Sequence, residues 1–97
     1  MNKKIKMVVE KSYLMLRKIS PNIKQSFSTE IKIKGNKSKF DSVDIVTFFS
    51  FLEKNLLNSK IKHQNFLDKN FFFKFDNISL KNLIESIKKE NEKKKLK

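Results

Sequence analysis

A single proline, Pro21, and a single glycine, Gly35, are all that interrupt these 97 residues. Because these residue types most often break regular structure, their scarcity favours a few long helices over a turn-rich sheet protein. Apolar residues recur at helical spacing in three stretches, 5–19, 45–56 and 80–87. The sequence therefore predicts three main helices in one small domain, the first of them ended by Pro21, since the residue before a proline is pushed out of the helical conformation.

The connections between these helices are less regular. Residues 20–40 form a long loop, in which 26–34 alternates enough for a short extended element. The phenylalanine-rich segment 66–75 forms a short third helix or a packed loop, with most of its rings in the core. We predict an all-α, four-helix bundle with a long first loop over residues 1–90, followed by a charged, disordered tail at 91–97.

Several classes of chemistry lack the residues they need. The chain has no cysteine, hence no disulfide and no thiolate ligand or nucleophile. The single histidine, His63, lies in a polar link, no cluster has metal-ligand spacing, and one glycine cannot make a phosphate-binding loop. We therefore expect neither a catalytic residue nor a metal site, and no enzymatic activity of the chain alone.

The apolar runs are too short for a membrane. None approaches the roughly 20 residues needed to span a bilayer, and the N-terminal run stops at Glu10, too soon for a signal peptide. We expect a soluble, cytoplasmic protein, with the monomer as the default state.

The formal net charge is +13, which suggests either affinity for nucleic acid or compositional bias. Only Arg17 among the 23 basic residues is an arginine, the residue that base-reading and phosphate sites favour. Lysine, asparagine, isoleucine and phenylalanine, which AT-rich codons specify, are all abundant. Compositional bias is the preferred interpretation, and we expect no specific nucleic-acid partner.

The most informative motif is Asp41-Ser42-Val43-Asp44, at the start of the second predicted helix. Carboxylates and capping groups are stabilised there by free N–H groups and the helix dipole. The hydroxyl of Ser42 is either a plain cap or a group presented to other molecules. Ile45, three residues after Ser42, is not the glutamate or glutamine of a capping box.

The order of segments from about Ile5 to Ile87 resembles the acyl carrier protein family. The densest match runs from Asp41 to Leu56, whose Asp-Ser-Val-Asp and later Leu-Glu are similar to the family's serine-bearing helix. The resemblance implies that a separate phosphopantetheinyl transferase attaches a 4'-phosphopantetheine arm to Ser42. It implies that Asp41 and Asp44 are the flanking acidic positions and that Val43 helps partners dock.

Such a carrier would present acyl thioesters to acyl-transferring or acyl-activating enzymes, in fatty-acid, polyketide-like or cell-surface acylation pathways. The expected docking positions are Val43, Thr47, Ser50 and Glu53. Family members are usually acidic, whereas Thr47 and Ser50 are neutral and Lys54 follows Glu53, which argues against docking through an acidic helix. The aromatic residues favour a filled core, hence a short or unsequestered acyl group.

Two other functions stay open. One is a small basic helical module that binds nucleic acid, with a salt-dependent affinity. The other is an interaction domain that keeps the carrier fold without modification, in which the hydroxyl of Ser42 should be buried or constrained.

Overall fold

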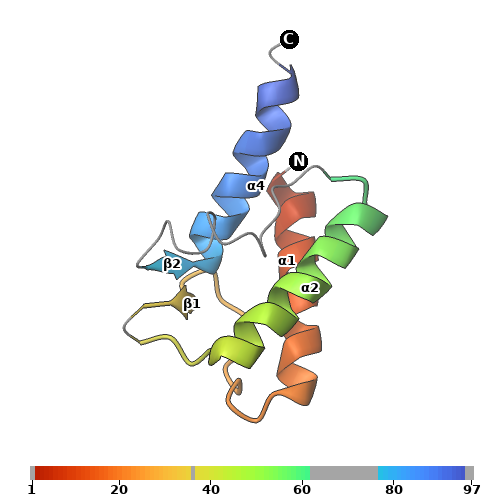
Figure 1. The fold of residues 1–97 in the computed structure, drawn as a ribbon. Coiled ribbons are helices and arrows are strands. Elements are labelled where there is room, and N and C mark those ends of the chain that lie inside the picture. The colour runs from red at the N-terminus through yellow and green to blue at the C-terminus, as the bar shows by residue number, and fades with distance from the viewer. Residues whose placement is uncertain (1, 36, 62–76, 96–97) are drawn as a thin grey trace.

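A computed structural model describes residues 2–35, 37–61 and 77–95, arranged as three helices and two short strands. Figure 1 shows α1 and α2 side by side and antiparallel, with α4 against the N-terminal part of α1. The elements are, in order, α1 (Asn2–Ile19), β1 (Lys32–Lys34), α2 (Ser42–Asn58), β2 (Ile78–Ser79) and α4 (Leu80–Lys95). The three predicted main helices are confirmed, and α1 ends two residues before Pro21.

The prediction of an all-α protein is wrong in one respect, because β1 and β2 form a two-stranded antiparallel sheet. Hydrogen bonds at the start of α4 explain why this sheet forms. The N–H groups of Leu80 and Lys81 donate to the carbonyls of Ile31 and Thr29, each at 2.9 Å. The first N–H groups of a helix have no partner inside the helix. The long loop supplies these partners, and its next residues pair with β2.

Two further predictions concern the second half of the chain. The short third helix over 66–75, and with it the four-helix bundle, lies outside the described residues and stays a prediction. α4 continues through Lys95, into the stretch predicted as a charged tail, and residues 96–97 lie outside the described residues. Within this stretch Asn91 donates to the carbonyl of Ile87 at 2.8 Å, and lysine and glutamate are good helix formers.

The core lies between the three described helices and the loop. A chain of aromatic rings links α1, the loop and α2: Tyr13 of α1 stacks on Phe40 at 6.5 Å between centroids, and Phe40 meets Phe48 of α2 edge-on at 5.8 Å. The Tyr13 hydroxyl donates to the carbonyl of Gln25 at 2.8 Å, which holds the loop against α1. The fully buried side chains are Ile5, Tyr13, Leu16, Ile33, Phe48, Phe49, Leu52, Leu56, Leu80, Leu83 and Ile87.

A buried polar pair fixes how α1 and α2 align. The amide of Asn55 donates to the Ser12 hydroxyl at 2.9 Å, and that hydroxyl donates to the carbonyl of Val8 at 2.9 Å. Sliding one helix along the other would separate the buried Asn55 amide from the Ser12 hydroxyl, at a cost of about 1–3 kcal/mol. This register places the start of α2 beside the end of α1.

Substituting the only glycine tests the turn that follows β1. Gly35 has φ of +113°, and a Cβ there would lie 2.5 Å from the Asn77 side-chain oxygen. We expect Gly35→Ala to lower the free energy of unfolding by about 1–3 kcal/mol, measured by urea denaturation. Lys37→Gly is the control, because Lys37 (φ 80°) already occupies the left-handed region. It should not lower stability, and equal stability of Gly35→Ala and the unchanged protein would contradict the account.

Candidate functional site

The cap of α2 is Asp41, one residue before the serine. Asp41 Oδ1 accepts from the N–H of Asp44 at 2.7 Å, and Asp44 Oδ2 accepts from the N–H of Asp41 at 3.1 Å. The sequence analysis missed this reciprocal capping box, because it took Ser42 as the cap and expected a glutamate or glutamine three residues later. Counted from Asp41, an aspartate occupies the third helical position and makes the same bond.

Asp44 also ties the start of α2 to the segment that follows α1. Its side chain is buried, with 5% of its surface exposed. The Ser20 hydroxyl donates to Asp44 Oδ1 at 2.6 Å, and the Asn22 amide donates to Asp44 Oδ2 at 3.4 Å and to Asp41 Oδ2 at 3.0 Å. Every carboxylate oxygen of the motif thus accepts a hydrogen bond. We call Asp41, Asp44, Ser20 and Asn22 the anchor.

The anchor changes the pKa of Asp44. Burial acts to raise it, but the hydrogen bonds from Ser20, from the N–H of Asp41 and from Asn22 outweigh burial. The net result is a pKa below the ordinary value for an aspartate. Asp44 therefore carries its charge inside the fold, compensated by donors, and is a structural residue as much as an acidic neighbour of Ser42.

Ser42 stands apart from this network. It is the first residue of α2, it is exposed, and no other described residue bonds to its hydroxyl. Among the described residues, the backbone N–H groups of Ser42 and Val43 also have no hydrogen-bond partner. Because Asp41 provides the cap, the serine hydroxyl is left free at a helix start whose N–H groups favour an anion.

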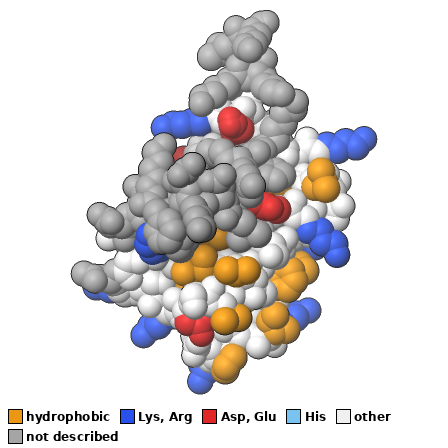
Figure 2. Space-filling view, in the orientation of Figure 1, with side chains coloured by type: hydrophobic (Ala, Val, Ile, Leu, Met, Phe, Trp, Pro, Cys, Tyr) orange, Lys and Arg blue, Asp and Glu red, His pale blue; other side chains and the backbone are white. Residues whose placement is uncertain are grey.

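The outer face of α2 carries the other predicted site residues. Val43 is 70% exposed, Ser50 is exposed, and Thr47 and Glu53 are half-buried. Sequence reasoning missed Val46 and Leu57, which are 54% and 72% exposed. Their positions, three and fourteen residues after Val43, place them on the same side of a helix, and this spacing was the available signal. In Figure 2, hydrophobic side chains gather on the face that α2 occupies in Figure 1.

The same face carries little charge. α2 has three charged residues, and one of them, Asp44, is buried. The other two, Glu53 and Lys54, are consecutive in the sequence and opposite in charge. The structure thus presents a mixed apolar and polar helix beside Ser42, with no cluster of carboxylates on α2.

Among the described residues, no group of three or more histidine, cysteine or acidic side chains is placed to hold a metal ion. His63 falls outside the described residues. None of the described helices combines the length and the apolar character that crossing a membrane requires.

Comparisons of the chain with protein-family models, with curated proteins and with solved structures find no match.

Alanine substitutions separate the cap from the serine. Asp41→Ala removes the acceptor for the N–H of Asp44, so it should lower the free energy of unfolding by about 0.5–2 kcal/mol. Ser42→Ala should change it by less than about 0.5 kcal/mol, because the Ser42 hydroxyl bonds to no described residue. Urea denaturation measures both. A larger loss from Ser42→Ala than from Asp41→Ala would show that the serine is the cap.

The lowered pKa of Asp44 predicts a pH dependence of stability. A folded-state pKa below the unfolded value favours the folded state above the unfolded pKa, and the gain is lost as pH falls through the folded pKa. Stability should therefore decrease below about pH 4. Asp44→Asn should cost about 1–3 kcal/mol at neutral pH and flatten this decrease, and Ser20→Ala should flatten it partly. An unchanged acid slope in Asp44→Asn, measured by urea denaturation across pH, would contradict the assignment.

Proposed function

We propose that this protein is a non-catalytic carrier that holds acyl groups on a 4'-phosphopantetheine arm attached to Ser42. One observation carries the proposal: the Ser42 hydroxyl is exposed and unbonded among the described residues, while its neighbour Asp41 makes the cap. A transferase can reach such a hydroxyl without unfolding the helix start. The resemblance of residues 5–87 to acyl carrier proteins, stated from the sequence, supports the same conclusion.

The residues around Ser42 fit a phosphodiester. The free N–H groups of Ser42 and Val43 and the positive end of the helix dipole would stabilise its charge, by about 0.3–1 kcal/mol at an exposed position. Asp41 and Asp44 oppose it less than two bare carboxylates would, because each already accepts hydrogen bonds within the anchor. When attached, the arm supplies a terminal thiol that carries the acyl group as a thioester.

The partners would be a phosphopantetheinyl transferase and acyl-transferring or acyl-activating enzymes. Val43 and Val46, both more than half exposed, offer them an apolar contact beside the serine. The aromatic contacts among Phe40, Phe48 and Phe49 fill the space near α2 with rings. This filling supports a short acyl group, or one that stays outside the core.

The exposure of Ser42 also bears on the rival of an unmodified interaction domain. That rival expects the hydroxyl to be buried or bonded, as the hydroxyls of Ser12 and Ser20 are in this fold. Those two serines have structural roles that Ser42 lacks, and the contrast favours modification at Ser42.

Intact-mass spectrometry after incubation with coenzyme A and phosphopantetheinyl transferases tests the proposal. We expect a mass increase of one phosphopantetheine group, lost in Ser42→Ala. Ser26→Ala is the control, because Ser26 is an exposed serine outside the predicted docking positions, and it should be modified like the unchanged protein. No increase with several transferases of broad specificity, or an increase that survives Ser42→Ala, would overturn the proposal.

A further inference from the structure

A cleft of about 560 Å³ lies between the first turns of α1, the loop before β1 and α4. Lysines dominate its lining: Lys3 and Lys6 come from α1, and Lys81 and Lys88 from α4. Glu30, Glu85 and the half-buried Ile84 complete the charged and apolar part of the lining. The walls thus combine a surplus of positive charge with apolar surface.

The cleft is remote from Ser42. Lys6 precedes Ile19, the last residue of α1, by thirteen residues, which is about 20 Å along the helix. The start of α2 is fixed at that far end of α1 by the bond between Ser20 and Asp44. The cleft is therefore a second surface, independent of whether Ser42 is modified.

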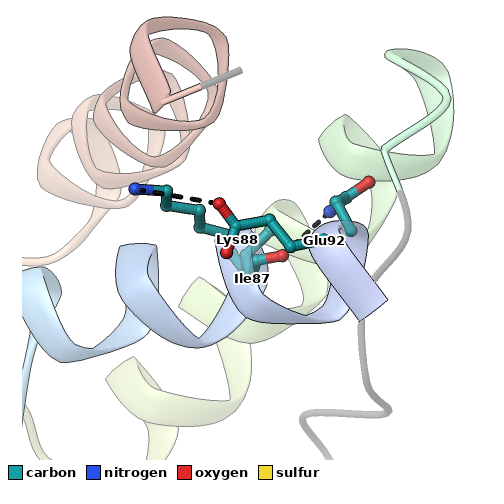
Figure 3. A network of polar contacts seen from close by, with 4 residues as sticks. Ile87, Lys88 and Glu92 are labelled. Carbon is teal, nitrogen blue, oxygen red and sulfur yellow. Dashed lines mark hydrogen bonds and ion pairs between the residues drawn. The ribbon is translucent and has the colours of Figure 1, made fainter. Parts of the chain in front are cut away.

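The lysines of the cleft are available to a partner. Lys3, Lys6 and Lys81 are exposed, and Lys88 forms an ion pair with Glu92 at 3.9 Å. Figure 3 shows these two side chains on successive turns of α4. Exposed pairs of this kind contribute little energy, so Lys88 can exchange Glu92 for another carboxylate.

The distribution of charge along the helices agrees with this surface. The sequence of α1 has six basic residues and one acidic residue, and that of α4 has six basic and three acidic. The sequence of α2 has one basic and two acidic residues. Charge of one sign collected on two helices attracts and orients a partner of the opposite sign.

Two features favour an acidic protein segment over a nucleic acid as that partner. Glu30 and Glu85 line the cleft among the lysines, and they would repel the closely spaced phosphates of a nucleic acid. The only arginine, Arg17, does not line it, although arginine is the side chain best suited to phosphate. A peptide can match both signs of charge and place an apolar side chain against Ile84.

We propose that the cleft between α1 and α4 binds an acidic, amphipathic segment of a partner protein. This goes beyond the carrier function and does not require it. The cleft supplies an electrostatic contact that the nearly neutral face of α2 does not.

Fluorescence anisotropy with a labelled amphipathic helical peptide of glutamate, lysine and leucine, net acidic, at physiological ionic strength, tests the proposal. Lys6→Glu with Lys81→Glu reverses one charge on each wall of the cleft, and should weaken binding at least about tenfold. Lys11→Glu with Lys18→Glu is the matched control, because it changes the net charge equally and neither residue lines the cleft. The control should weaken binding less than about threefold.

Circular dichroism checks that each variant keeps its helices, and Lys3→Glu with Lys88→Glu provides a second cleft variant should the first unfold. If the cleft and control variants weaken peptide binding equally, the binding is due to diffuse electrostatic attraction, and the proposal is overturned. So would the absence of peptide binding by the unchanged protein. Tighter binding of a single-stranded oligonucleotide of equal charge, lost in the cleft variants, would replace the acidic segment with nucleic acid.

Discussion

The buried carboxylate of Asp44 is the interaction on which the arrangement of the site depends. An unpaired charge in that position would be strongly destabilising, because burial removes its water. Donors from Ser20, Asn22 and the N–H of Asp41 replace that water, and they come from two separate segments of the chain. The charge therefore requires that the end of α1 and the start of α2 meet. The Ser12–Asn55 pair fixes the same two helices further along.

This arrangement divides the Asp-Ser-Val-Asp motif into structural and presented residues. The side chains of Asp41 and Asp44 each accept a hydrogen bond from the other's backbone N–H. Ser42 and Val43, which lie between them, stay exposed. The helix start is thus rigidly held without using the serine. The lysine-lined cleft lies near the other end of α1, so the proposed attachment at Ser42 and the proposed electrostatic contact use separate surfaces of the molecule.

The helices were predictable because their apolar stripes are long and periodic, and the stop at Pro21 follows from the geometry of proline alone. The exposure of Ser42 was anticipated as one of two alternatives. β2 could not be predicted, since two residues carry no periodicity and their pairing depends on where α4 begins. Ser20 and Asn22 were also out of reach, because their bonds to Asp44 and Asp41 join positions far apart in sequence. The capping box was visible in principle, had the count begun at Asp41.

The central claim is that the contact between Ser20 and Asp44 holds the start of α2 in place so that Ser42 is free. A double-mutant cycle measures it directly, with urea denaturation of Ser20→Ala, Asp44→Asn and the double variant at neutral pH. The account predicts non-additive losses, with a coupling energy of about 0.5–3 kcal/mol, as found for residues in direct contact. Losses that simply add would show that the two side chains act independently, and would contradict the account.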